Sequence, residues 1–178
     1  MPEANTVLKP FNVEEFLSPA TLERADKTVA EIFGMMLGLE IEVVETSDLG
    51  PDTPESDERT AVVGFSGAMR GSCHIRMTAQ GARSVASAML GGAPIDEGDD
   101  SINDALGELC NMLAGGWKND TPGLSSECAL SPPTVISGRN YRVRMIKPSV
   151  KASRMYRFDI HALQLTLCCE DIESRTDE

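Results

Sequence analysis

The chain contains the stretch Ser101-Ile-Asn-Asp104-Ala-Leu-Gly-Glu108-Leu-Cys-Asn111-Met-Leu-Ala-Gly-Gly116, which has the apolar spacing of an amphipathic helix. An α-helix turns about 100° per residue, so its larger apolar side chains gather in one stripe. The stripe consists of Ile102, Leu106, Leu109, Met112 and Leu113. On the opposite side, a second set of positions falls within roughly 60° on the same geometry. These positions are Asp104, Glu108, Asn111 and Gly115.

The ends of this helix are predicted from the residues that flank the stripe. Ser101 precedes the apolar residues and is the expected N-cap. Asp104 lies in the first turn, where the positive end of the helix dipole stabilises a carboxylate. Gly115 and Gly116 predict that the helix stops there, because glycine commonly follows the last helical residue.

The polar face of the helix has two interpretations. In the first it is an ordinary solvated surface. In the second it is functional, because asparagine is a poor residue for a helix interior, where its amide competes for backbone groups. Asn111 follows Glu108 by about one turn, so the face presents a neutral amide beside a carboxylate. From the residues alone both interpretations remain open.

Within this stretch, Asp104-Ala-Leu-Gly-Glu108-Leu-Cys-Asn111-Met-Leu-Ala-Gly115 resembles the signature helix of the CheC/CheX-type chemotaxis phosphatases. The pattern shared by that family is an acidic residue or serine, three residues, glutamate, two residues and asparagine. A proline follows further along in the family, and Pro132 and Pro133 stand near the expected place. Together with the segments described below, the resemblance covers most of the chain.

The resemblance implies a function and a role for each residue of the polar face. The implied substrate is a phosphorylated CheY-type receiver domain, which supplies its own Mg²⁺. Asn111 would orient the attacking water, as an amide does in some phosphoryl-transfer enzymes, and Glu108 would dock on the receiver's active-site lysine. Asp104 and Gly115 would extend the partner-binding face. No metal or cofactor of the chain's own is expected. The alternative is a non-catalytic CheX-like module that binds a receiver or the flagellar switch.

The two halves of the sequence show a weak internal repeat. Glu31-Ile-Phe-Gly34-Met-Met-Leu-Gly38 aligns with Glu108-Leu-Cys-Asn111-Met-Leu-Ala-Gly115. Gly34 stands where the functional asparagine would be needed, so we expect one working site, in the second half. This arrangement is similar to that of CheX rather than to the two-site arrangement of CheC. The same resemblance implies a homodimer.

Hydrophobic periodicity and turn residues predict the remaining elements. Helices are expected after Ser18-Pro19, ending at Gly38, and over 79–90 with Thr78 as its cap. Strands are expected over 39–43, 62–65, 73–77, 134–136, 141–145 and 156–168. An acidic loop is expected over 45–60, and an irregular segment over 117–133.

These elements predict an α+β fold, in which an antiparallel sheet packs against about three main helices and the two halves are pseudo-symmetric. We expect an N-terminal tail over 1–12, one phosphatase domain over 13–170 and a polar tail over 171–178. With 178 residues, of which 41% are hydrophobic, the chain is long enough for one domain with a core of its own.

The net charge and the cysteines of the chain indicate which partners, metal sites and cellular locations are not expected. The formal net charge is -12, which disfavours nucleic acid and anionic membrane surfaces as partners. No segment has the length and apolar character of a membrane span or the order of a signal peptide. The five cysteines show no spacing typical of a metal site, so a reduced, cytoplasmic protein is expected.

The other chemically active residue types are expected to be structural. His74 and His161 lie on predicted strands with no cluster of carboxylates around them. Cys168 and Cys169 alternate with apolar residues, which predicts a buried pair on a strand. Trp117 follows the central helix, and two roles stay open for it: a docking contact or a core residue.

Overall fold

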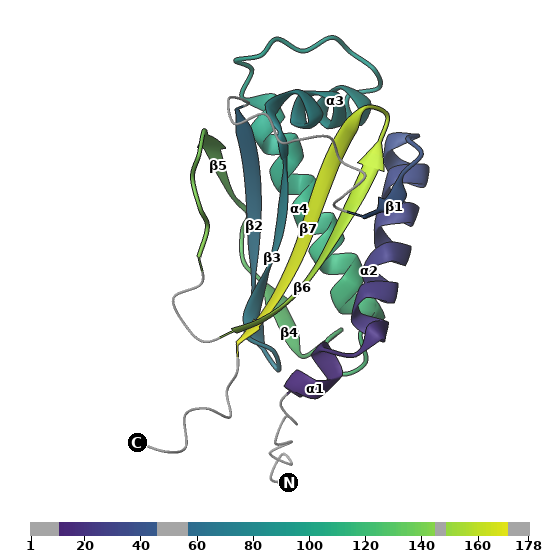
Figure 1. Ribbon diagram of the computed structural model, residues 1–178, viewed down its shortest axis with the longest axis vertical. Coiled ribbons are helices and arrows are strands. Elements are labelled where there is room, and N and C mark those ends of the chain that lie inside the picture. Colours follow the sequence, from purple (N-terminus) through teal and green to yellow (C-terminus); the bar gives the residue numbers. More distant parts are fainter. Residues whose placement is uncertain (1–10, 46–56, 145–148, 171–178) are drawn as a thin grey trace, which may run out of the picture.

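The computed structural model describes residues 11–45, 57–144 and 149–170, which form an antiparallel sheet and the helices packed against it (Figure 1). The helices are α1 (Val13–Phe16), α2 (Pro19–Ile32), α3 (Ala79–Met89) and α4 (Ser101–Asp120), with a π-helical turn η1 (Phe33–Leu37). The strands are β1 (Glu42–Val44), β2 (Glu58–Gly67), β3 (Gly71–Thr78), β4 (Cys128–Leu130), β5 (Thr134–Gly138), β6 (Ser149–Phe158) and β7 (His161–Glu170). The predicted α+β fold with three main helices is confirmed.

The pairing of the strands is symmetric between the two halves of the chain. The sheet has the order β1-β6-β7-β3-β2-β4, and β5 also pairs with β2. If β1, β2 and β3 are exchanged for β5, β6 and β7, the β1–β6 pair becomes β5–β2 and the β2–β3 hairpin becomes β6–β7. The central β3–β7 pair maps onto itself. The topology therefore confirms the predicted pseudo-symmetric halves.

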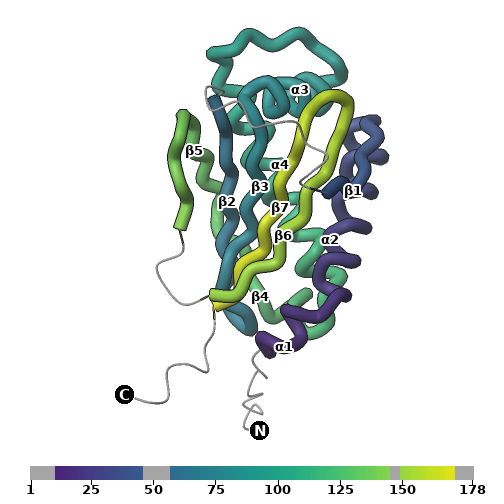
Figure 2. Tube along the Cα trace, viewed as in Figure 1, coloured from purple at the N-terminus to yellow at the C-terminus, as the bar shows by residue number. Residues whose placement is uncertain are grey.

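The helices α2 and α4 cover one face of the sheet, and α3 lies across one end of it (Figure 1). The trace in Figure 2 shows the β2–β3 and β6–β7 hairpins running next to each other in front of α4. Apolar side chains of alternate strand residues point toward the helices. Ala61, Cys73, Ile75 and Leu165 are buried on this face. The Cys110 thiol of α4 lies 3.6 Å from the carbonyl oxygens of Ala61 and Cys73.

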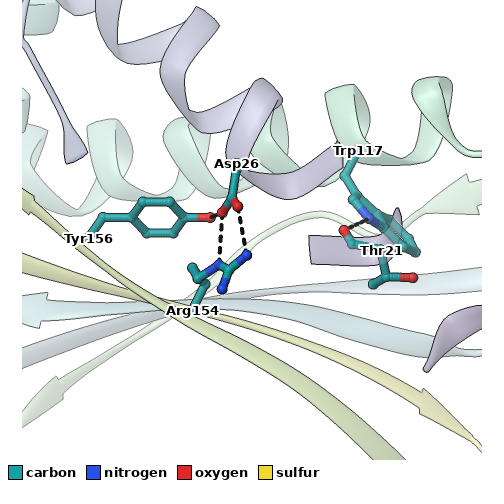
Figure 3. A network of polar contacts seen from close by, with 5 residues as sticks. All are labelled: Thr21, Asp26, Trp117, Arg154 and Tyr156. Carbon is teal, nitrogen blue, oxygen red and sulfur yellow. Dashed lines mark hydrogen bonds and ion pairs between the residues drawn. The ribbon is translucent and has the colours of Figure 1, made fainter. Parts of the chain in front are cut away.

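Polar contacts of Asp26 and Thr21 join α2 to β6 and to α4 (Figure 3). The Asp26 carboxylate accepts bonds from Arg154 Nε and Nη2, at 3.0 and 2.7 Å, and from the Tyr156 hydroxyl at 2.8 Å. Near the start of α2, the Thr21 carbonyl accepts a hydrogen bond from Trp117 Nε1 at 3.1 Å. Because Trp117 is buried, the core interpretation of this residue is correct.

The predicted start of the central helix is wrong by one residue. Ser101 is the first helical residue, and Asp100 occupies the N-cap position. The capping bond comes from Asp99, whose carboxylate accepts the Ser101 backbone N–H at 2.8 Å. This bond lowers the pKa of the Asp99 carboxyl, because it stabilises the charged form.

The predicted stop at Gly115 and Gly116 is also wrong, because α4 continues to Asp120. At Gly116 an ideal Cβ would stand only 2.5 Å from Thr28 Cγ2. The glycine therefore serves a close approach of α4 to α2 rather than a helix end. One turn beyond Trp117, the Thr121 hydroxyl donates to the Trp117 carbonyl at 2.7 Å, where the helix does end.

The predicted single strand over 156–168 is a hairpin. The chain turns at Asp159, which has a φ of 48°, and at Ile160, so β6 and β7 pair antiparallel. The predicted first helix ends at Gly38 as expected, with a φ of 65°, but its last residues form the π-helical turn η1.

Other strand predictions need smaller corrections. The first strand begins at Glu42 rather than at residue 39, and β2 begins at Glu58, inside the predicted acidic loop. Residues 141–144 form no strand, and β4 lies in the segment predicted to be irregular. The buried Cys168–Cys169 pair on a strand is confirmed, and all five cysteines are free thiols.

The predicted tails and most of the acidic loop lie outside the described residues, at 1–10, 46–56 and 171–178. Phe11, inside the first predicted tail, packs against the core, and its backbone N–H donates to the Ala68 carbonyl at 3.0 Å. Asn12 caps α1 by accepting the Glu14 N–H at 2.6 Å. The domain boundaries themselves stay a prediction.

Candidate functional site

The polar face of α4 lies where the helical spacing places it. Asp104 and Glu108 are exposed, and Asn111 and Gly115 are half-buried. The opposite face is buried in the core, with Ile102, Leu106, Leu109 and Leu113 each at most 1% exposed. Met112 is half-buried at the edge of that stripe rather than inside the core. The helix is thus held by its apolar side, and its polar stripe lies on the outside of the molecule.

The segment between β4 and β5 packs against the flank of this stripe. An ideal Cβ at Gly107 would stand 3.2 Å from Pro133 Cγ and 3.7 Å from Val135 Cγ2. The buried glycine lets the chain at Pro133 approach the helix next to Glu108. Gly107, a glycine inside the helix, is the sequence feature that permits this contact with Pro133.

The side of α4 at Gly115 is less closely packed than the side at Gly107. An ideal Cβ there would meet only Leu130 Cδ1, at 3.8 Å, which is an ordinary van der Waals contact. Packing within the chain therefore does not require glycine at this position. A small residue beside Asn111 leaves room for another molecule to approach the amide.

Glu108 and Asn111 have no hydrogen-bonding or ion-pair partner among the described residues. Their place opposite the apolar stripe predicts that both side chains are exposed, and this is correct for Glu108, whereas Asn111 is half-buried. A half-buried amide is held more firmly by its surroundings than an exposed one, because fewer rotamers are open to it. The two side chains are about one helical turn apart on a helix anchored by its core face. They are thus oriented by the scaffold and available to a partner.

This arrangement offers one negative charge and one neutral group that both donates and accepts hydrogen bonds. Such a pair can bind a cation with the carboxylate and orient a polar molecule with the amide. Within the described ranges, no group of three or more His, Cys, Asp or Glu side chains is placed to hold a metal ion. None of the helices found there is long and apolar enough to span a membrane.

The model for the family of chemotaxis phosphatase CheX matches residues 59–156, a range that includes all of α4. A curated relative, the CheY-P phosphatase CheX of Thermotoga maritima, is 32% identical over 104 residues, which make up 56% of this chain and 67% of that protein. The chain belongs to the CheX family.

Solved CheX structures have the same fold. CheX from Vibrio vulnificus superposes with a TM-score of 0.69 at 18% identity, covering 84% of this chain and 96% of that one. The CheX-CheY-BeF3-Mg²⁺ complex from Borrelia burgdorferi contains a chain that superposes with a TM-score of 0.64 at 19% identity. The superposition covers 85% of this chain and 98% of that one. At these identities the likeness concerns the fold, and the roles of individual residues must come from the site itself.

Proposed function

We propose that this protein is a phosphatase that hydrolyses the aspartyl phosphate of a CheY-type receiver domain, with Asn111 and Glu108 as its site. The observation that carries the proposal is the outer stripe of α4, where the exposed Glu108 and the half-buried Asn111 lack partners among the described residues. The name of the Thermotoga maritima relative supports the substrate class. The Borrelia burgdorferi complex, which combines CheX with CheY, BeF3 and Mg²⁺, supports a receiver that brings its own metal ion.

In the proposed reaction a water oxygen attacks phosphorus, and the bond between phosphorus and the receiver's aspartate oxygen breaks. The electron pair of that bond stays on the aspartate carboxylate, and inorganic phosphate leaves with the protons of the water. The Asn111 amide holds the water in line through its oxygen and NH₂ group, because positioning is a large part of catalysis in phosphoryl transfer. An amide is too weak a base to remove the proton, so Asn111 acts by orientation alone.

Glu108 is proposed to bind the receiver's active-site lysine, a charge-assisted contact that fixes the docking angle. Asp104, one turn earlier on the same exposed stripe, adds negative charge to this face, and Gly115 leaves space beside the amide. Helical residues suit this task because the core face of α4 limits their movement. The proposal retains the homodimer and the cytoplasmic location expected from the sequence.

The test compares Asn111→Ala with wild type on a phosphorylated receiver of the same organism. The variant should lose about 100-fold or more of the accelerated phosphate release, because a misplaced nucleophile costs about that much. Its affinity for the receiver bound to beryllofluoride should stay within about twofold. Asn119→Ala is the matched control: the same substitution on the same helix, at an exposed position about two turns beyond Asn111.

Each outcome decides between the two functions. If Asn111→Ala loses hydrolysis but still binds the receiver, and Asn119→Ala keeps both, the result supports the phosphatase function. If wild type binds the beryllofluoride form but accelerates phosphate release from none of the organism's receivers, the chain is a binding module instead. Equal loss in Asn111→Ala and Asn119→Ala would reject the assigned site.

A further inference from the structure

The face of the sheet that points away from α2 and α4 carries polar side chains on its central strands. Strand residues alternate between the two faces, so the neighbours of the buried Ile75 and Leu165 point outward. On β3 these are His74 and Arg76, and on β7 they include Thr166. Figure 1 shows this face in front of the helices.

These side chains line a cavity of about 230 Å³. It is built from four strands and from Tyr141 and Val143 of the segment after β5. The lining residues are Thr60, His74, Arg76, Tyr141, Val143, Lys151, Ser153, Gln164, Thr166 and Cys168. The volume suits a molecule of a few heavy atoms, since drug-sized ligands need about 300 Å³ or more.

The charged side chains that line the cavity are basic. Among the described residues, its lining includes two basic side chains and a histidine but no carboxylate, although the chain has a net charge of -12. Arg76 forms an ion pair with Glu58, which is outside the lining. Lys151 has no such pair with any described residue and is exposed into solvent. Among the residues that the structure describes, the charge of Lys151 at the cavity is therefore not compensated by an ion pair.

Neutral donors surround this charge. The Ser153 and Thr166 hydroxyl oxygens lie 3.0 Å apart and share one hydrogen bond, which leaves the second hydroxyl proton free to donate within the described structure. The Ser72 hydroxyl and His74 Nε2 are 2.7 Å apart, which fixes the imidazole ring at the cavity. When Nε2 accepts the Ser72 hydroxyl proton, the ring N–H is on Nδ1. A lysine beside hydroxyl groups and such a ring N–H is a donor set that can bind oxyanions.

We propose that this cavity binds a small free oxyanion, phosphate or a carboxylate, with Lys151 as its counter-charge and Ser153, Thr166 and His74 as neutral donors. The site lies on the face of the sheet opposite to α4, so it is separate from Glu108 and Asn111. It does not depend on the proposed phosphatase activity. It also gives His74 a ligand-binding role, where the sequence predicted a structural one.

The test is an NMR titration of the full chain with sodium phosphate and, in a separate arm, sodium succinate, both at constant ionic strength. Binding should give saturable shifts of backbone amides in β3, β6 and β7. Lys151→Met should weaken binding about tenfold or more, since a hydrogen bond to a charged group contributes about 1.5–3 kcal/mol. Thr166→Val should weaken it by a smaller factor.

Lys27→Met is the matched control, because it removes the same charge from an exposed lysine on α2. It should leave the affinity within about twofold. Saturation with phosphate only, with succinate only or with both supports the site and names its preferred anion. Shifts that never saturate, or equal weakening by Lys151→Met and Lys27→Met, would show a response to overall charge and overturn the proposal. Lys151 is exposed, and an unchanged spectrum of the free variant confirms that it folds.

Discussion

Glu108 and Asn111 lie about one turn apart, yet their contacts belong to different stages of the proposed reaction. The proposed lysine contact of Glu108 would form as soon as the receiver docks, whereas the water that Asn111 is proposed to hold matters in the transition state. Glu108→Gln should therefore weaken receiver binding about tenfold or more, and added salt should reduce the difference from wild type. Calorimetric titration with the beryllofluoride form of the receiver measures the affinity of both proteins. Unchanged affinity in Glu108→Gln would remove Glu108 from the docking face.

Asp26 has a structural role that can be measured as stability. Its carboxylate accepts bonds from Arg154 and from the hydroxyl of Tyr156, which is 1% exposed. Asp26→Ala leaves this buried hydroxyl and the guanidinium without their acceptor, so unfolding should become easier by about 2 kcal/mol. Asp120→Ala, which breaks only the exposed pair with Lys27, should cost less than about 1 kcal/mol. Urea unfolding compares the two variants, and equal effects would contradict the assignment.

His74 should give the protein a pH-dependent stability. Burial first, and then the charge of Lys151, lower the pKa of His74 below the ordinary value of about 6.5. Arg76, Ser72 and Cys168 also face this region. Between the folded pKa and about pH 6.5 the unfolded chain binds more protons. The free energy of unfolding should therefore fall as the pH drops below about 6.5, and above that value the contribution of His74 is complete.

An NMR titration of the His74 ring should give a midpoint below that of the same residue in urea. Lys151→Met should move the midpoint upward, because it removes one of the two causes of the shift. In urea unfolding, the loss of stability between pH 7.5 and pH 6 should be smaller for His74→Gln than for wild type. A midpoint at or above the value in urea would contradict the prediction.

At the scale of elements, the contact between α2 and α4 depends on Gly116. A methyl group there would meet the side chain of Thr28, which is buried and β-branched and cannot easily turn away. Gly116→Ala should therefore destabilise the protein by about 1–3 kcal/mol. Gly115→Ala, one residue earlier, should be neutral or stabilising by up to about 1 kcal/mol, since alanine favours the helix and meets only Leu130. Thermal unfolding of both variants separates the two positions.

The same glycine shows why the helix could be predicted from the sequence while its end could not. The spacing of Leu106, Leu109 and Leu113 is a local signal, and the buried face follows it. Whether Gly116 ends the helix or permits a close contact depends on Thr28, which is distant in the sequence. The hairpin at Asp159 was missed for a related reason: apolar residues run through both of its strands, and no glycine marks the turn.

The position of the polar stripe on α4 could be predicted because it is local to one helix, and its role as the functional site stays a proposal. Asp104, Glu108 and Asn111 share a stripe because helical geometry alone decides it. The burial of Asn111 was underestimated, since it depends on neighbouring segments that the helical spacing does not describe. The cavity at Lys151 could not be predicted, because its lining comes from strands whose register is set by the whole sheet.

At the scale of the whole molecule, the pseudo-symmetry relates the two halves so that α2 of the first half corresponds to α4 of the second. Gly34 then corresponds to Asn111, and Ala30 to Gly107. Both first-half residues line a groove of about 620 Å³, together with Glu42 and Arg157, which form an ion pair with each other. An ideal Cβ at Gly34 would meet nothing within 4 Å, so packing does not exclude a side chain there. The first half thus has a groove at the position that corresponds to the proposed site, and it lacks the amide.

This comparison predicts one working site per chain. Glu31 corresponds to Glu108, but its carboxylate lies 3.8 Å from Lys27 Nζ, so it is partly neutralised and has no amide partner at position 34. Glu31→Ala should therefore keep receiver dephosphorylation within about twofold of wild type, and its stability should change by about 0.5 kcal/mol or less. Calorimetric titration with the beryllofluoride form of the receiver should give one receiver per chain. Loss of activity in folded Glu31→Ala, or a ratio of two, would place a functional site on the first half as well.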